Sequence, residues 1–200
     1  FRRMIQLVHW IFFTGLGEYV TPWLGSLYAI PLVALGGLLV GIMTRYMDPQ
    51  TKGHGVPEVM LAVAYRGGRI RPQLTLFKTI GAALTIGSGG SAGREGPIVQ
   101  IGSAIGSTIG QIFRLPDRRM ILSVACGAAG GVAATFNAPM AGVIFSLEVI
   151  LGRFTATSFG LVVMSSATAT VVSRSLSAEG DSPAFGMLHT YSMASIWDLF

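Results

Sequence analysis

The chain has 200 residues, of which 51% are hydrophobic and 12% are charged, and its mean hydropathy is +0.61. Ordinary soluble domains carry about 25% charged residues, so this composition indicates a protein that folds in a lipid bilayer and argues against a soluble enzyme. The net charge of +5 comes from short Arg and Lys clusters between apolar segments, a pattern that reflects membrane topology rather than nucleic-acid binding.

Apolar segments and basic clusters alternate through the first part of the chain. Residues 4–16 are too few to cross the ~30 Å hydrocarbon core, and we expect them to be the outer part of a longer helix. Residues 27–47 are long enough to cross. Residues 53–65 open with Gly-His-Gly-Val-Pro-Glu and are too short at ~1.5 Å per residue, so we expect this segment to dip into the membrane and return.

Two half-length helices are predicted on either side of a glycine-rich break. Residues 74–86 and 98–113 are apolar, and residues 87–97 between them read Gly-Ser-Gly-Gly-Ser-Ala-Gly-Arg-Glu-Gly-Pro. Polar backbone at membrane depth must be buried in protein or face a water-filled cavity. In channels and transporters such breaks usually hold the ion, so we expect this break to face an ion pathway.

The C-terminal part contains two charge-free stretches, residues 120–147 and 154–173, which reach the ~20 residues needed to cross the membrane. Residues 134–139 interrupt the first stretch with Ala-Thr-Phe-Asn-Ala-Pro. Asn137 is placed to cap the helix that follows, and Pro139 suits the first turn of that helix. The break pattern is therefore expected three times in the chain.

The basic residues are expected to share one face of the membrane, because each segment between the clusters is predicted to dip and return. The positive-inside rule assigns that face to the cytoplasm. The residues concerned are Arg45, Lys52, Arg66, Arg69, Arg71, Lys78, Arg114, Arg118, Arg119 and Arg153.

Gly102, Gly106 and Gly110 recur at four-residue spacing, which forms a groove of small residues along one helix face. Such a groove is typical of close helix packing in membranes. The alternative is that this face lines a narrow pathway.

The breaks also predict the kind of ion. Each would point helix N-termini, with free N–H groups and the positive end of the dipole, toward the middle of the membrane, where they can bind an anion. A buried lysine would hold a small anion too tightly, whereas conduction needs binding that is favourable yet weak. We therefore expect an anion pathway built from backbone amides.

Three signatures occur in order along the chain: Gly53-His54-Gly55-Val56-Pro57-Glu58, then Gly93-Arg94-Glu95-Gly96-Pro97 with Val99-Gln100-Ile101-Gly102, then Asn137-Ala138-Pro139-Met140-Ala141-Gly142-Val143-Ile144-Phe145. Their order and spacing resemble the CLC family of voltage-gated chloride channels and proton/chloride antiporters. The resemblance implies an all-α, polytopic membrane fold with broken and re-entrant helices. It also implies that residues 1–200 are the first of two inverted repeats, truncated at both ends, without the second repeat, and that the full-length protein is a homodimer with one pathway per subunit, in a cell membrane.

By this resemblance Glu95 is the gating glutamate, whose carboxylate occupies the outer anion position when the path is closed. A carboxylate at a helix N-terminus competes for the N–H groups that an anion would use; the alternative is an acid that only caps the helix beside Arg94. Chloride would be the transported ion, and no cofactor or metal is implied. The implied anion-binding residues are Gly53, His54, Gly55, Val56, Pro57, Arg94, Glu95, Gly96 and Pro97.

His54 stands where most of the family has serine, whose hydroxyl donates to the central anion. A neutral imidazole can donate one N–H, and its protonation between pH 5 and 8 would add charge beside the ion. The alternative is that His54 faces cytoplasmic solvent while the neighbouring glycine backbone binds the anion.

Two further acids are assigned structural roles. Glu58, after Pro57, is expected to stabilise the first turn of its helix through the dipole. Glu148 is expected to be a structural acid near the cytoplasmic rim, with a proton relay as the alternative. The next position, where proton-exchanging members often carry an internal glutamate, is Val149, which favours channel-type passive conduction of chloride, with a proton-coupled antiporter as the alternative.

Two readings outside ion transport remain. Residues 89–93 match the Gly-x-Ser-x-Gly pattern of serine hydrolases, but that pattern needs a strand before the serine, and here the flanks are apolar helices. An intramembrane hydrolase is therefore the enzyme alternative to the prediction that the chain is not an enzyme. A non-conducting membrane scaffold with the same fold is the other.

Overall fold

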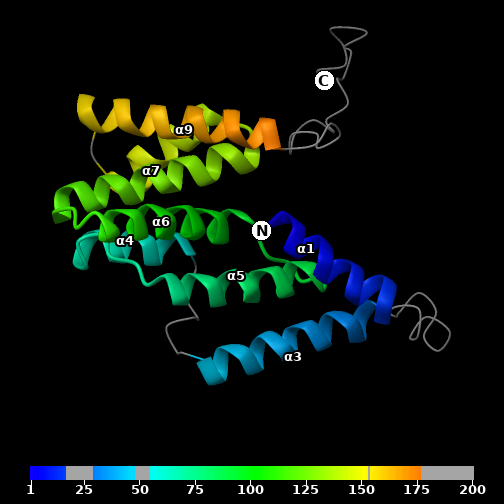
Figure 1. Ribbon diagram of the computed structural model, residues 1–200. Helices are drawn as coiled ribbons and strands as arrows, with labels where there is room; N and C mark the ends of the chain where they lie inside the picture. The colour runs from blue at the N-terminus through cyan, green and yellow to red at the C-terminus, as the bar shows by residue number, and fades with distance from the viewer. Residues whose placement is uncertain (17–28, 48–54, 153, 177–200) are drawn as a thin grey trace, which may run out of the picture.

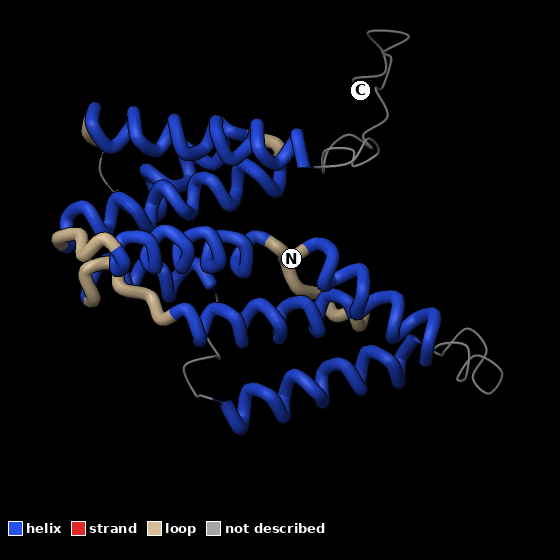
Figure 2. The backbone as a smooth tube through the Cα atoms, in the orientation of Figure 1, coloured by secondary structure: helices blue, strands red, loops and turns tan. Residues whose placement is uncertain are grey.

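The structure is a computed structural model, and it describes residues 1–16, 29–47, 55–152 and 154–176 (Figure 1). Within these ranges the secondary structure is helical, with no strand (Figure 2), which confirms the predicted all-α class. The helices are α1 (Arg2–His9), η1 (Trp10–Leu16), α3 (Ala29–Met47), α4 (Gly55–Tyr65), α5 (Pro72–Gly87), α6 (Glu95–Ile112), α7 (Asp117–Phe136), α8 (Pro139–Phe145), η4 (Ser146–Leu151) and α9 (Ala156–Leu176).

The helices lie side by side in layers, with α6 near the middle (Figure 1). On one side α6 packs against α7, which in turn packs against α9; on the other side lie α4 and α5, and α3 lies outside α5. The core between α4, α6 and α7 contains small apolar side chains such as Val99, Val124 and Ala128, which are at most 1% exposed. These small side chains allow the helix backbones to approach closely.

The glycine groove on α6 packs against α7, as the structural interpretation predicted. A Cβ on Gly102 would overlap the carbonyl oxygen of Gly127, and a Cβ on Gly106 would lie 2.9 Å from the carbonyl carbon of Ser123. The Ser123 hydroxyl donates to the Gly106 carbonyl at 2.8 Å. Backbone therefore lies directly against backbone here, and the groove does not line a pathway between these two helices.

Among the helices that the structure describes, α7 and α9 are long and apolar enough to cross a membrane. In contrast, α4 has only 11 residues, in agreement with the predicted dipping segment. The glycine-rich break lies where it was predicted, but α6 begins at Glu95, before the apolar run at Ile98. Within the break Gly89 has a φ of +93°, a left-handed conformation that favours glycine.

The third break differs from the prediction in one respect. Pro139 is the first residue of α8, as expected, but Asn137 does not cap that helix. Asn137 instead ends α7 in the left-handed conformation, with a φ of +54°, which asparagine tolerates better than most residues. Its Oδ1 accepts a hydrogen bond from Nε of Arg174 at 2.6 Å, so its side chain ties the end of α7 to α9.

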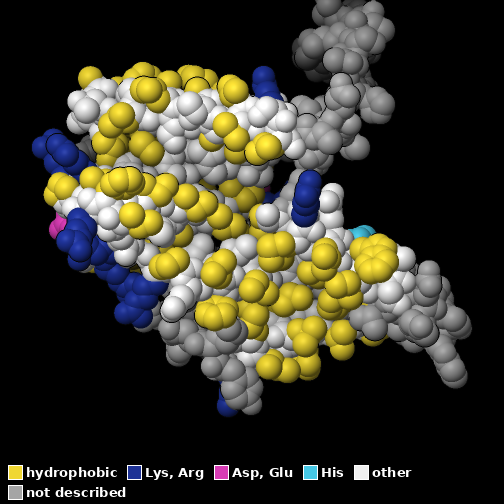
Figure 3. Space-filling view, viewed as in Figure 1, with side chains coloured by type: hydrophobic (Ala, Val, Ile, Leu, Met, Phe, Trp, Pro, Cys, Tyr) yellow, Lys and Arg dark blue, Asp and Glu magenta, His cyan; other side chains and the backbone are white. Residues whose placement is uncertain are grey.

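Most of the described basic side chains gather at one end of the bundle. In Figure 3 they lie at the edge where α4 and α6 end and where α5 and α7 begin. Segments 66–71 and 114–119 supply six of the arginines, Arg66, Arg69, Arg71, Arg114, Arg118 and Arg119. This agrees with the predicted basic face, for which Lys52 and Arg153 lie outside the described residues and Lys78 is an exception treated below.

Candidate functional site

The N-termini of α4 and α6 lie against each other. A Cβ on Gly55 would overlap the carbonyl oxygen of Gly96 and would lie 2.7 Å from its carbonyl carbon, while a Cβ on Gly96 would lie 3.6 Å from the Gly55 nitrogen. The two helices run in the same direction, because residue 58 of α4 also contacts residue 100 of α6. Two parallel helix N-termini therefore open side by side.

This geometry suits an anion for a simple electrostatic reason. The amides in the first turn of a helix have no intrahelical partner, and the helix dipole places partial positive charge there. No side chain caps α6 by a hydrogen bond. Pro57 and Pro97 occupy the first turns of their helices, where the missing proline N–H removes no intrahelical hydrogen bond. The remaining first-turn amides can point at one ligand from two helices.

The structure brings together seven of the nine residues predicted to bind an anion, at the starts of α4 and α6. Gly53 and His54 lie outside the described residues. The seven are Gly55, Val56, Pro57, Arg94, Glu95, Gly96 and Pro97.

Glu95 is the first residue of α6, and its side chain is exposed. Its carboxylate folds back over the preceding break, because a Cβ on Gly93 would overlap Oε2 of Glu95 and would lie 3.4 Å from its Cδ. Glycine at position 93 thus leaves the space that the carboxylate fills. The gating role of Glu95 remains a prediction, but the acid lies at the mouth of the paired helix N-termini.

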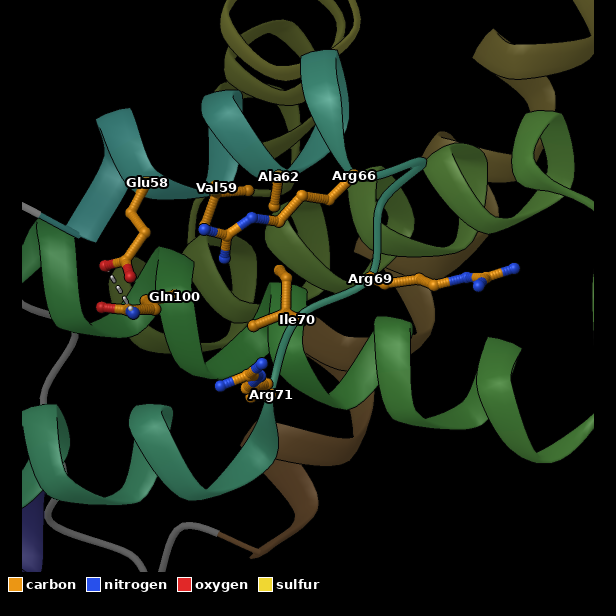
Figure 4. A pocket seen from close by; sticks show the side chains of 8 residues that line it. All are labelled: Glu58, Val59, Ala62, Arg66, Arg69, Ile70, Arg71 and Gln100. Carbon is orange, nitrogen blue, oxygen red and sulfur yellow. Dashed lines mark hydrogen bonds between the residues drawn. The ribbon is translucent and has the colours of Figure 1, made fainter. Parts of the chain in front are cut away.

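A partly buried ion pair lies one helical turn below these N-termini, and it corrects the predicted place of Lys78. Lys78 was predicted on the basic face, yet its side chain is only 8% exposed and its Nζ forms an ion pair with Oε2 of Glu58. Glu58 also accepts a hydrogen bond from Nε2 of Gln100 at 3.2 Å (Figure 4). The prediction was wrong because the positive-inside rule assigns basic residues to a membrane face from the sequence alone. It takes no account of an acid on a neighbouring helix that can pair with one of them.

This ion pair links three helices. Lys78 belongs to α5, Glu58 to α4 and the fully buried Gln100, which is 2% exposed, to α6. Glu58 lies in the first turn of α4, as predicted, but its carboxylate also pairs with Lys78. A lone cation in the apolar run of α5 is the sequence signal that could have revealed the pair, since a charge at membrane depth requires a partner.

Glu148 and Val149 lie on η4 and face different surroundings. Glu148 is exposed, and its side chain makes no hydrogen bond or ion pair with the described residues. Val149 is half-buried and packs against the core between α4, α6 and α7. An acid at position 149 would therefore need a polar environment that this core does not offer in the described residues.

Ser91 lies in the loop between α5 and α6. A hydrolase nucleophile elbow requires a strand before the serine, and here the serine follows a helix instead. Of the histidines, His9 stacks on Phe13 with ring centroids 4.5 Å apart, which gives no support to a catalytic pairing with Ser91.

The chain has clear relatives. The family model described as voltage gated chloride channel matches residues 36–200. The chain is 31% identical, over 97% of its length, to a putative chloride channel protein ClcB-like of Ralstonia nicotianae, of which it covers 46%. It is 36% identical, over 80% of its length, to the H(+)/Cl(−) exchange transporter ClcA of Vibrio cholerae, of which it covers 34%. The chain thus spans less than half the length of these relatives.

A solved structure shares the fold. The X-ray crystal structure of a slow cyanobacterial Cl−/H+ antiporter matches 89% of this chain and 42% of its own, with a TM-score of 0.68 at 24% identity. This likeness supports a helical, polytopic membrane fold for the bundle described above.

Proposed function

The chain belongs to the voltage-gated chloride channel family, and we propose that the protein of which it is part transports chloride across a membrane in exchange for protons. The observation that carries the proposal is the contact between Gly55 and Gly96, which sets two parallel helix N-termini side by side. This arrangement offers a small anion the first-turn amides of two helices without a full positive charge.

Glu95 is proposed as the gate of this site. Its carboxylate and chloride carry the same charge and would use the same first-turn amides, so the two compete. Protonation of Glu95 removes its negative charge and therefore the competition. In the described conformation the carboxylate lies over Gly93, which provides a resting place beside the helix start.

Similarity to proteins named as proton/chloride exchangers favours exchange of chloride for protons over passive conduction of chloride. Those from Vibrio parahaemolyticus and Vibrio cholerae are called H(+)/Cl(−) exchange transporters, and the solved structure is called an antiporter. This reverses the preference for a channel drawn from Val149. A proton route that does not use position 149 is part of the proposal.

The rest of the pathway is proposed to come from a second, inverted repeat, with two such subunits forming a homodimer in a cell membrane. Gly53 and His54, which precede α4 in the chain, would also belong to the anion site. In this proposal α4 and α6 would supply one half of a cradle that the second repeat would close.

The proposal is tested with the full-length protein reconstituted in liposomes under an outward chloride gradient. The wild-type protein should move protons inward against their gradient while chloride leaves. Glu95→Gln should pass chloride without moving protons, whereas Asp117→Asn, which also removes a first-turn carboxylate but at the basic end, should keep both fluxes. If the wild-type protein passes chloride without moving protons against their gradient, the passive channel is the correct function. If it passes no chloride, the proposal of chloride transport is wrong.

A further inference from the structure

The loop between α4 and α5, residues 66–71, is held rigidly on α6. The Ile70 amide donates to the Ser107 hydroxyl at 2.9 Å, and that hydroxyl donates to the Gly68 carbonyl at 2.8 Å. Nε2 of Gln111 donates to the Ile70 carbonyl at 3.2 Å. Ser107 is fully buried and Ile70 is 8% exposed. The backbone of this loop is therefore fixed by buried hydrogen bonds.

The same loop is also pressed against α7. Gly67 and Gly68 have φ values of +56° and +80°, where side chains other than glycine are strained. A Cβ on Gly68 would lie 3.1 Å from the Ile121 nitrogen, and one on Gly67 would lie 2.8 Å from Cγ of Asp117. The loop backbone is thus packed on α6 and α7 and forms a rigid platform, unlike a surface turn without such contacts.

Two arginine side chains extend from this platform toward one hollow. Figure 4 shows the guanidinium groups of Arg66 and Arg71 on the same side of the loop, with Ile70 between them, while Arg69 extends to the other side. Arg69 is paired with Asp117 at 3.5 Å. Arg66 and Arg71 form no ion pair within the described residues. The hollow of about 250 Å³ is lined by Arg66, Arg69, Ile70, Arg71 and Gln111. Figure 4 draws a neighbouring pocket, which shares the first four of these residues and is also lined by Glu58 and Gln100.

Exposed apolar residues adjoin the lining residues along the chain. Tyr65 at the end of α4 is 83% exposed, and Ile112 and Phe113 at the end of α6 are 72% and 74% exposed. Guanidinium groups bind phosphate oxygens in a bidentate manner, and a cationic pocket between helix ends beside apolar side chains is typical of a lipid headgroup site. A free phosphate ion would gain nothing from the apolar rim.

We propose that Arg66 and Arg71 bind the phosphodiester of an anionic phospholipid in the leaflet at the arginine-rich end of the bundle. The platform on α6 fixes the backbone from which the two arginine side chains extend, so that no further backbone entropy is lost on binding. The acyl chains would lie along the apolar side chains at positions 65, 112 and 113. This role is independent of the anion pathway at the opposite ends of α4 and α6.

The test uses the full-length protein in detergent, titrated with phosphatidylglycerol and followed by native mass spectrometry. Arg66→Gln/Arg71→Gln should weaken binding roughly thirtyfold, which corresponds to about 1 kcal/mol for each arginine near an anionic lipid. The matched control Arg118→Gln/Arg119→Gln removes the same charge from exposed arginines at the same end of the bundle. Its affinity for phosphatidylglycerol should stay within about threefold of the wild-type value, a change smaller than the contribution of one arginine.

Two further arms separate lipid from other anions. Arg66→Lys/Arg71→Lys should recover only part of the affinity, because ammonium groups cannot form the bidentate contact. Millimolar inorganic phosphate should not displace phosphatidylglycerol from the wild-type protein. Equal losses in the glutamine double variant and its control, or displacement by inorganic phosphate, would overturn the proposal.

Discussion

Replacing Lys78 with Met should destabilise the protein strongly, because it leaves Glu58 with a charge that has lost its cationic partner. The Lys78 side chain is 8% exposed and that of Glu58 is 22% exposed, so water can solvate the remaining carboxylate only in part. Breaking a buried ion pair by removing one partner costs about 3–5 kcal/mol. We expect the lower end, about 3 kcal/mol, since Glu58 keeps some exposure and the hydrogen bond from Gln100.

The assay is thermal unfolding of the full-length protein in detergent, followed by fluorescence. A loss of about 3 kcal/mol should lower the melting temperature by about 3–4 °C in a protein of about 400 residues, for which the unfolding entropy is about 0.85 kcal/mol per kelvin. Glu58→Gln with Lys78→Met should recover most of the loss, because the double variant leaves no unpaired charge. Arg45→Met, which removes an exposed cation from α3, should change stability by less than about 0.5 kcal/mol. A single variant as stable as wild type, or a double variant as unstable as the sum of its parts, would refute the reasoning.

Two other predictions concern packing and the anion. Gly106→Ala should lose about 1–3 kcal/mol of stability in the same melting assay, because its Cβ would meet the backbone of Ser123. The control Gly37→Ala, whose Cβ would have nothing within 4 Å, should gain up to about 1 kcal/mol. Equal effects of the two substitutions would contradict the packing of α6 on α7. In a Glu95→Gln background, chloride binding measured by calorimetry should strengthen as the pH falls from 8 to 5, because a protonated His54 near the anion adds an attraction on the order of 4 kcal/mol at an effective dielectric of ~20. His54→Ser should lose this pH dependence, and an unchanged dependence would place His54 away from the anion.

The breaks in the helices could be predicted from the sequence because their causes are local. Glycine clusters and prolines interrupt helices wherever they occur, and the structure places breaks after Gly87 and before Pro139 where the pattern indicated. Asn137 was assigned to the wrong helix for a local reason too. The same residue type suits a helix N-cap and a left-handed helix end, and only the backbone of the folded chain, with a φ of +54° at Asn137, distinguishes the two.

The arrangement of the site could not be predicted to the same degree, because it depends on contacts between distant segments. Gly55 and Gly96 stand in separate signatures, and nothing in either signature states that their backbones touch. Lys78 was misplaced for the same reason. Its charge was counted with its neighbours along the chain, whereas its position is determined by Glu58 on another helix.

The paired helix starts explain why two acids with different surroundings occur at one place. Parallel N-termini set side by side repel each other through their partial positive charges, and a carboxylate in each first turn offsets that repulsion. Glu58 offsets the repulsion at α4, and its carboxylate is held in place by Lys78 and Gln100. Glu95 offsets the repulsion at α6 from an exposed position over Gly93. Under the proposed function, a chloride ion can therefore replace the second carboxylate but not the first, and the fixed pair below leaves Glu95 as the acid that exchanges.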